Sequence, residues 1–363
     1  MDTKALCQKV LDLAIRGKLV PQDSNDEPAS VLLARIRAEK QQMVKDGKLK
    51  AKDLKGDSVI FKGEDNLHYE KMPDGTVKCI ESEIPFEVPE GWAWTRLCAI
   101  TQFVSDGDHQ PPPQSTSGVP FLVISDVNTG VLNFSNCRFV ENSYYDSLPT
   151  TRKAQIGDIL FTVTGSYGIP VGVKTNMPFC FQRHIALLRP LLVVAEMMTF
   201  VLESDFVMDL CHSTATGIAQ KTVGLHSIRG FLVPLPPYCE QQRIVNTISS
   251  AFAQIDILEK EKADLQTIIT QAKSKILDLA IRGKLVPQDP NDEPAAVLLE
   301  RIREEKESLI KQGKLKREKN ESFIFRGDDK SYYEKVGDTV QNIDAQIPFE
   351  VPDSWAWVRL DTV

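Results

Sequence analysis

The sequence predicts a mixed α/β (α+β) central domain combined with long coiled-coil helices, flanked at both ends by repeated helical and arm segments. Three observations support this fold class: a long segment that occurs twice, a heptad pattern of apolar residues, and a series of short strand-like runs separated by turns. The length of 363 residues fits two or three structural units, because a domain commonly has about 150 residues.

The composition excludes several classes of protein. With 42% hydrophobic and 26% charged residues the chain is ordinary for a globular protein, so it is neither wholly disordered nor fibrous. The formal net charge of -7 excludes a uniformly basic coat for nucleic acid, although it is compatible with a local basic patch. Arg189 and Pro190 interrupt the most apolar run, and no segment approaches the roughly 20 apolar residues that span a membrane.

The cysteines predict neither a disulfide framework nor a zinc site. There are seven, widely spaced, and no two form a Cys-x-x-Cys pair. The count is odd, and the first residues mix charged and apolar side chains rather than forming a secretory leader. We therefore expect reduced thiols in a cytoplasmic protein without a metal site.

The first element in chain order is the repeat. Residues 11–37 and 277–303 are identical at 24 of 27 positions. The match continues, with small gaps, to the Trp-Ala-Trp triplets at 92–94 and 355–357. Such identity within one chain indicates that both copies make the same contacts; the alternative is a recent duplication with no symmetric role. Residues 1–47 are expected to form the N-terminal repeat helices, the second of them over 29–47 between Pro28 and Gly47.

Residues 48–91 are polar and mixed in charge, so we expect a polar linker or loosely structured arm. The unique segment that follows, 92–238, has the pattern of a mixed α/β domain. Its strand-like runs are 119–123, 131–134, 159–163, 171–173 and 185–188, and its helical runs are 143–148 and 195–211. Its charge is nearly balanced, so electrostatics alone would not indicate DNA binding.

A heptad pattern predicts a long coiled-coil helix over 239–283. It begins after Pro236 and Pro237, and Gly283 is a suitable C-terminal stop. At about 1.5 Å per residue, the helix would be about 65 Å long. Lys262 also falls on the seam, where it either sets the register or extends to solvent. The apolar seam positions are Ile244, Ile248, Ala251, Ile255, Leu258, Leu265, Ile269, Ala272, Ile276 and Leu279.

Such a helix holds domains at a fixed distance or dimerises; the alternative is a core helix of one large domain. The second repeat copy follows it, with a repeat helix over 284–313. Residues 314–363 are expected to form a second polar arm, followed by the start of a second domain like 92–238.

No catalytic motif stands out in the sequence. The glycine-rich stretch 157–172 lacks the Gly-Lys-Ser/Thr of a phosphate-binding loop. Leu235 stands before Pro236, Pro237 and Tyr238, where an adenine methyltransferase needs a side-chain acceptor. His184 has no partner in the sequence that would complete a catalytic triad. We therefore expect that the chain catalyses nothing by itself.

Several stretches together resemble the specificity (S) subunits of type I restriction-modification systems, the HsdS family. They are LDLAIRGKLVPQDPNDEPAAVLLERIR, IPFEVPEGWAWTRL, GDILFTVTGSYG, FQRHIALLRP and VPLPPYCEQQRIV followed by the heptad helix. The resemblance covers essentially the whole chain, and the order of these motifs makes it specific.

The resemblance implies a DNA sequence-specificity subunit rather than an enzyme. Such a subunit carries two target-recognition domains, each of which reads half of a bipartite duplex DNA sequence, and its conserved helices separate them as a ruler. Methyltransferase (M) subunits that use S-adenosylmethionine dock on those helices. Restriction (R) subunits, translocases that use ATP and Mg, complete the nuclease. The chain itself would bind no cofactor.

One departure from the family pattern affects this interpretation. The sequence contains one recognition domain, 92–238, and ends near the point where a second should begin. We expect either a truncated form or a half-subunit that forms a homodimer through the long helix and reads an interrupted palindrome. Two alternatives stay open: a coiled-coil scaffold protein, and an inactive remnant of a truncated specificity gene.

Base-edge recognition needs side-chain donors and acceptors on protruding loops, and phosphate contacts need Lys, Arg and hydroxyl groups. Four polar stretches of the central domain have that mixture, at residues 105–109, 164–167, 182–184 and 214–221. For each residue, ordinary surface or turn polarity is the alternative. The candidate DNA-binding residues are Ser166, Tyr167, Gln182, Arg183, His184, Thr216, Gln220 and Lys221.

Overall fold

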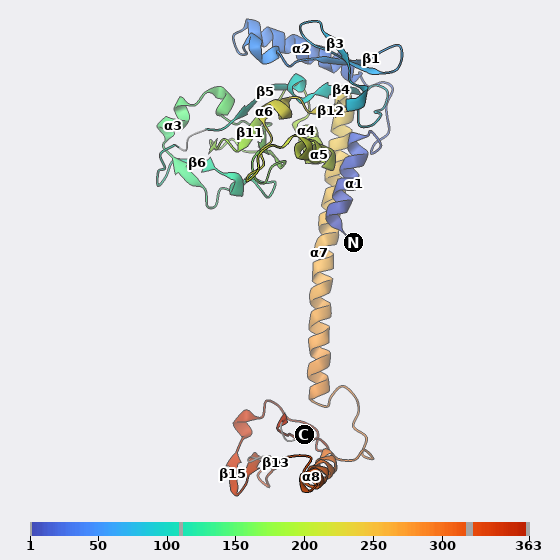
Figure 1. The fold of residues 1–363 in the computed structure, drawn as a ribbon, viewed down its shortest axis with the longest axis vertical. Coiled ribbons are helices and arrows are strands. Elements are labelled where there is room, and N and C mark those ends of the chain that lie inside the picture. The colour runs from blue at the N-terminus through green and yellow to red at the C-terminus, as the bar shows by residue number, and fades with distance from the viewer. Residues whose placement is uncertain (1, 109–111, 317–321, 361–363) are drawn as a thin grey trace. The chain divides into compact units, whose positions relative to one another are not determined.

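The computed structural model describes residues 2–108, 112–316 and 322–360 (Figure 1). The chain divides into two compact units, residues 1–259 and 260–363, each with its own set of contacts. Helix α7 (Tyr238–Ile281) contributes its first part to the first unit and its last part to the second.

The N-terminal repeat forms two helices, as the sequence predicts. Helix α1 (Thr3–Ile15) begins at Asp2, whose carboxylate accepts a hydrogen bond from the Ala5 amide at 3.1 Å. Helix α2 (Ala29–Lys45) begins directly after Pro28 and ends two residues before Gly47, which has a φ of +72°.

The expectation of a polar linker over 48–91 is wrong for much of this stretch. After a short 3-10 helix, η1 (Ala51–Leu54), the strands β1 (Val59–Lys62), β2 (His68–Lys71) and β3 (Val77–Cys79) form an antiparallel sheet in the order β1-β2-β3. Its polar residues organise a buried ion pair. Glu70 accepts hydrogen bonds from Ser58 at 2.5 Å and from Arg96 at 3.0 and 2.8 Å. A polar sequence thus folds because its charges pair with one another.

Strand β4 (Ala93–Arg96) opens the central domain and pairs antiparallel with β12 (Leu232–Leu235), which closes it. Trp92, just before β4, donates its indole N–H to Glu240 of α7 at 2.9 Å, and Gln22 donates to the same carboxyl at 2.8 Å. Burial raises the pKa of Glu240. These bonds join the repeat, the central domain and α7.

A four-stranded antiparallel sheet forms the centre of this domain, in the order β5-β11-β8-β9. Successive side chains point to opposite faces, and both faces are buried: Phe161 and Leu188 pack toward the helices, and Leu160 and Leu187 toward the smaller sheet. The strands are β5 (Thr101–Asp106), β8 (Ile159–Thr162), β9 (Pro170–Gly172) and β11 (Ile185–Pro190).

The smaller sheet has the order β10-β6-β7, with β10 parallel to β6 and β7 antiparallel to it. Its strands are β6 (Val119–Leu122), β7 (Arg138–Val140) and β10 (Cys180–Phe181). The strand expected at 131–134 is absent: Val131 is exposed, and the Asn133 amide bonds the Asp126 carbonyl in a loop.

The helix expected over 195–211 is two helices, α4 (Ala195–Glu203) and α5 (Asp205–Thr214). Ser204 separates them, because its hydroxyl accepts from the Val207 amide as an N-cap and its backbone is extended. The short helix expected at 143–148 is α3 (Asn142–Ser147), and α6 (Leu225–Arg229) precedes β12.

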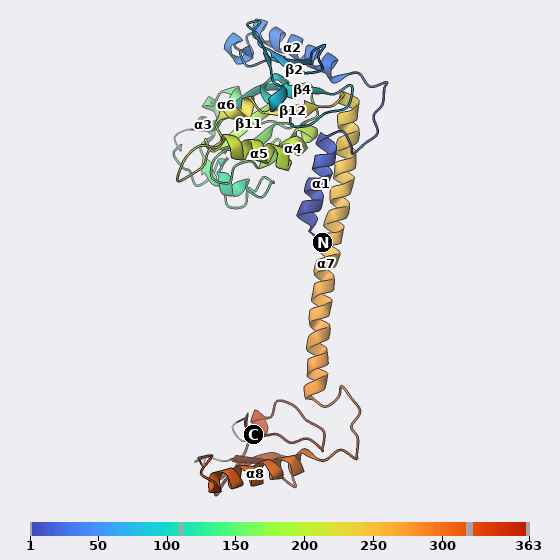
Figure 2. The same cartoon turned by 45° about the vertical axis from the view of Figure 1, so that its right-hand side comes forward.

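The predicted long helix is confirmed as α7, with bounds within two residues of those expected. Its seam positions Ile244, Ile248 and Ile255 are buried. Helix α1 runs beside this part of α7 (Figures 1 and 2), and Leu11, Ala14 and Ile15 share a core with Ile244 and Ile248.

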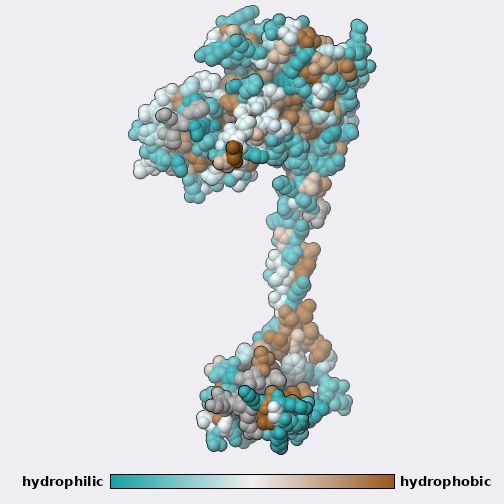
Figure 3. Space-filling view, in the orientation of Figure 1, coloured by the Kyte–Doolittle hydropathy of each residue, from teal (hydrophilic) through white to brown (hydrophobic). Residues whose placement is uncertain are grey.

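The remaining seam of α7 is largely uncovered by the described residues. Leu258, Leu265, Ile269 and Ile276 are 43–57% exposed. Apolar surface gathers along this part of the helix in Figure 3. The coiled-coil pattern of α7 therefore extends beyond the part of the helix that α1 covers.

The second repeat copy folds like the first. It has helix α8 (Ala295–Lys311) and an antiparallel sheet in the order β13-β14-β15, so the polar arm expected over 314–363 is also partly a sheet. Residues 317–321 and 361–363 of that stretch lie outside the described residues. The strands are β13 (Ser322–Arg326), β14 (Tyr332–Val336) and β15 (Thr339–Asn342).

The two copies make matching internal contacts. Glu334 accepts from Arg359 at 2.9 and 2.7 Å, as Glu70 accepts from Arg96. Gly283 has a φ of +65° and packs so closely on Pro352 that a Cβ would overlap the proline ring, and Gly17 has the same relation to Pro89.

Candidate nucleic-acid interface

Backbone hydrogen bonds bring three loops of the central domain together. The Val163 amide, after β8, donates to the His184 carbonyl at 2.9 Å. The Gly165 amide donates to the Lys221 carbonyl at 3.1 Å, and the Thr222 hydroxyl lies 3.2 Å from that of Thr164. The loop cluster comprises residues 163–168, 182–184 and 214–222, and it includes all eight candidate residues.

The end of β5 supports this loop cluster. The Arg183 amide donates to the Asp108 carbonyl at 3.1 Å, and Asp108 forms a parallel bridge with Gln182. Gly107 permits this approach, because a Cβ there would overlap the Phe181 carbonyl oxygen. The Asp108 carboxylate is held in turn by Arg152 at 2.5 Å and by the Tyr144 hydroxyl.

The candidate side chains differ in exposure. Tyr167, Gln182 and His184 are half-buried. The exposed candidates are Ser166, Arg183, Thr216, Gln220 and Lys221. Arg183 and Lys221 therefore supply positive charge at the surface of the loop cluster, and the others supply neutral donors and acceptors.

Two of the half-buried side chains have specific surroundings. The Tyr167 hydroxyl lies 2.9 Å from His212 Nδ1, and the two rings meet edge to face. Burial and the charge of Arg183 lower the pKa of His184, which favours the neutral imidazole. A neutral imidazole offers one donor and one acceptor, which suits a hydrogen bond to a base better than an ion pair with a phosphate.

Sequence reasoning took Thr216 only as a DNA contact and missed Thr222, Gly217 and Ile218 of the third loop. Reciprocal backbone hydrogen bonds between Thr216 and Thr222, of 2.9 and 2.8 Å, close it into a tight hairpin-like turn in which Gly217 has a φ of +108°. Ile218 is fully exposed at its tip. An apolar residue inside a polar loop was the available signal, since apolar side chains contact thymine methyl groups or unstacked base steps.

Across residues 2–108, 112–316 and 322–360, no group of three or more His, Cys, Asp and Glu side chains is placed to hold a metal ion. No helix in these ranges is long and apolar enough to cross a membrane. The cysteines are all free thiols, and burial raises the pKa of Cys211 to about 12.

Residues 113–267 match the family model described as the type I restriction modification DNA specificity domain. The match covers the loop cluster and the first part of α7. The curated relatives include the specificity subunits of the Escherichia coli type I restriction enzymes EcoAI and EcoEI, at 30% and 31% identity over 99% of this chain. The chain spans 62% and 61% of the length of these two relatives.

Solved structures also resemble the chain. One comes from a study of complex assembly and conformational transition of the type I R-M system, with 20% identity, a TM-score of 0.46, and coverage of 78% of this chain and 58% of the other. Another is the HsdS subunit from Thermoanaerobacter tengcongensis, with 19% identity, a TM-score of 0.41, and coverage of 78% and 57%.

Proposed function

We propose that the chain is a specificity subunit of a type I restriction-modification system, and that it binds one half of a bipartite duplex DNA target through the loop cluster. The observation that carries the proposal is the convergence of all eight candidate residues from three loops of the matched domain. Donors, acceptors and two exposed cations on one surface are what recognition of base edges and phosphates requires.

The same proposal gives the chain a positioning role instead of a catalytic one. Methyltransferase subunits dock on it, and restriction subunits that act as translocases complete the complex in the cytoplasm. S-adenosylmethionine, ATP and Mg are held by those partner subunits and not by this chain. The long helix α7 supports this role, since a single helix of 44 residues can keep a DNA-reading domain at a set distance from another.

We further propose that the uncovered seam of α7 pairs with the same seam of a second copy. Four apolar seam side chains, each about half exposed, favour a partner, because leaving them in water forgoes the free energy of burial. A two-fold pair would present two identical recognition domains, which predicts an interrupted palindrome as the target.

Replacing Leu265 and Ile269 together by Glu is expected to abolish this pairing, as measured by sedimentation equilibrium. Replacing the exposed Gln266 by Glu is the control and should leave the dimer intact. A wild-type chain that stays monomeric at all accessible concentrations would refute the pairing. This result would leave the proposal of DNA binding unaffected.

Co-expression with the methyltransferase subunit of the same operon tests the function as a whole. Adenine methylation is then mapped genome-wide by single-molecule sequencing. Methylation at an interrupted palindrome is the expected result. An asymmetric split motif would mean that another chain provides the second recognition domain. Absence of methylation with a folded protein would contradict the proposed function.

A further inference from the structure

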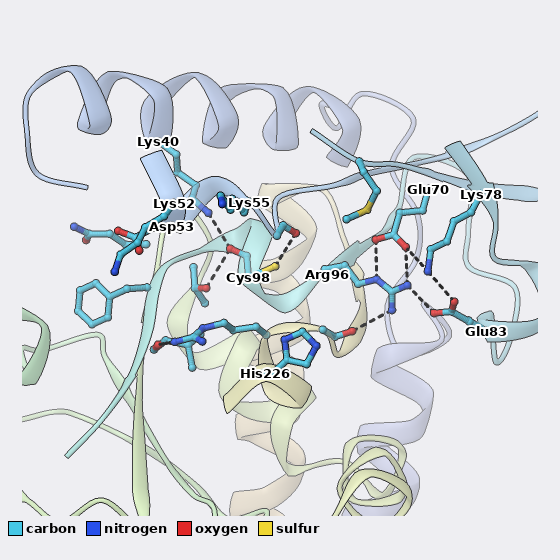
Figure 4. Close-up of a pocket in the computed structure, with 18 residues that line it drawn as sticks. Lys40, Lys52, Asp53, Lys55, Glu70, Lys78, Glu83, Arg96, Cys98 and His226 are labelled. Atoms are coloured by element: carbon cyan, nitrogen blue, oxygen red, sulfur yellow. Dashed lines mark hydrogen bonds and ion pairs between the residues drawn. The ribbon is translucent and has the colours of Figure 1, made fainter. Parts of the chain in front are cut away.

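A second charged surface lies in the first unit, outside the loop cluster. It is a groove of about 950 Å³ between the N-terminal repeat and the central domain (Figure 4). Residues of η1 and of the β1-β2-β3 sheet line one part of it, and residues of β5 and α6 line another. Six cationic side chains and three carboxylates line the groove, in a chain whose net charge is -7.

Three of those cations are already neutralised. Arg96 and Lys78 both pair with Glu70 and Glu83, at distances between 2.6 and 3.3 Å. Lys40 pairs with Asp57 at 2.5 Å. The ion pairs of Arg96 join the repeat to the start of the central domain, and all of these pairs leave little charge for a ligand.

The other three cations have no carboxylate partner among the described residues. Lys52 and Lys55 are exposed on and just after η1. Arg229 ends α6 and donates one N–H to the Val104 carbonyl at 2.5 Å, which fixes its guanidinium at the wall of the groove. The remaining acid, Asp53, accepts from the Lys50 amide at 2.9 Å as part of the η1 turn. This part of the groove therefore carries excess positive charge.

Two elements connect the groove to the loop cluster. Strand β5 lines the groove with Thr101, Gln102 and Val104, and its other end lies beside 182–184. Six residues of strand span about 20 Å, which is about six base pairs of duplex at about 3.4 Å each. Helix α6 begins four residues after Lys221 of the loop cluster and carries Arg229 to the groove.

We propose that this groove binds the sugar-phosphate backbone of duplex DNA beside the half-site that the loop cluster reads. Lys52, Lys55 and Arg229 are the phosphate contacts. The inference rests on the proposed function and adds a site formed jointly by the repeat and the recognition domain. Contacts to phosphates fix the position of a protein on a duplex without reading its sequence.

The test uses the full chain and a random-sequence duplex, with the dissociation constant measured over a series of salt concentrations. The variant Lys52→Ala/Lys55→Ala is expected to lower the slope of log K against log salt by about 1–2, because each lost phosphate contact removes about 0.9. Both side chains are exposed, so the fold, checked by circular dichroism, should not change. The matched control is Lys45→Ala/Lys48→Ala, which removes the same charge from exposed positions that do not line the groove.

The outcomes separate the two proposals. If the salt slope of the groove variant equals that of the wild type, the groove does not contact phosphates and this proposal is refuted. Binding of duplex by the wild type would still support the proposed function. An equal loss in the control also overturns it, since the effect would then come from total charge. If the wild-type chain does not bind duplex at low salt, the proposed function itself fails.

Discussion

At the scale of one residue, the buried carboxylate of Glu70 stabilises the polar β1-β2-β3 sheet through its ion pair and hydrogen bonds. Burial alone would raise the pKa of this carboxyl, but the hydrogen bonds and charge of Arg96 and the Ser58 hydroxyl lower it to about 2. Because the folded-state pKa is depressed, the stabilisation is fully present above about pH 4.5 and is lost as the pH falls toward 2.

Glu70→Gln is therefore expected to destabilise the chain by about 2–4 kcal/mol at pH 7, since it breaks a buried ion pair. The free energy of unfolding is measured by urea denaturation between pH 7 and pH 2. The difference between wild type and variant should shrink below pH 4.5. A difference that stays constant over this range would show that the ionised carboxylate is not the source of the stability.

At the loop cluster, the exposed cations are expected to contribute most to affinity for DNA. Arg183→Ala and Lys221→Ala should each weaken binding of the half-site by about 1–3 kcal/mol if they contact bases. Lys174, exposed in the same domain but outside the loop cluster, provides the control Lys174→Ala. The measurement is fluorescence anisotropy with the methylated motif as the duplex, and wild-type affinity in both variants would remove these residues from the interface.

At the scale of elements, the repeat places the same helical sequence in two environments. Leu11 in α1 is 1% exposed against the core that includes α7, and its counterpart Leu277, at the end of α7, is 65% exposed. Residues 11–23 and 277–289 have the same sequence, so the difference comes from packing alone. Local sequence pattern predicts a helix at both places but does not say which copy is covered.

Leu11→Ala is expected to cost about 2–4 kcal/mol of stability, because it leaves a cavity in a close-packed core. Leu277→Ala should cost less than about 0.5 kcal/mol in the monomeric chain, since no buried contact is lost. Thermal unfolding of the two variants at low protein concentration compares them directly. Equal losses would mean that Leu277 is buried by a partner.

The elements were predicted unevenly. The long helix, the repeat helices and the strands β6, β8, β9 and β11 follow from periodicity and from Pro and Gly signals, which act over a few residues. The strands β4, β5, β7, β10 and β12 were not predicted. The β1-β2-β3 sheet was missed because its strands alternate polar residues whose partners, such as Arg96, lie far along the chain. The break at Ser204 was missed because the apolar pattern continues across it.

At the scale of the whole molecule, the two units differ in how much apolar surface they bury. Among the described residues after 260, only Tyr332 and Ile343 are buried apolar side chains, whereas the first unit contains an extended core. A region with few buried apolar contacts unfolds locally at a small cost in free energy. The second unit should therefore be the less stable one.

Hydrogen exchange followed by mass spectrometry is expected to show fast exchange of the amides in β13–β15 and slow exchange in β5, β8 and β11. The β1–β3 sheet is an internal control, since it has the same topology but belongs to the first unit, where β1 lies against β4. Docking of a partner subunit on the second unit should slow the exchange of β13–β15. Equal protection in the two sheets of the isolated chain would contradict this expectation.

The sequence alone determined the duplicated architecture, the long helix and the resemblance to type I specificity subunits, because these follow from identity, periodicity and motif order along the chain. It also selected eight polar loop residues without a reason to place them together. Only the tertiary structure decided that their three loops meet, through bonds such as Val163 to His184 and Gly165 to Lys221. It likewise decided which half of the α7 seam is covered. Both depend on contacts between residues distant in sequence, which no local pattern specifies.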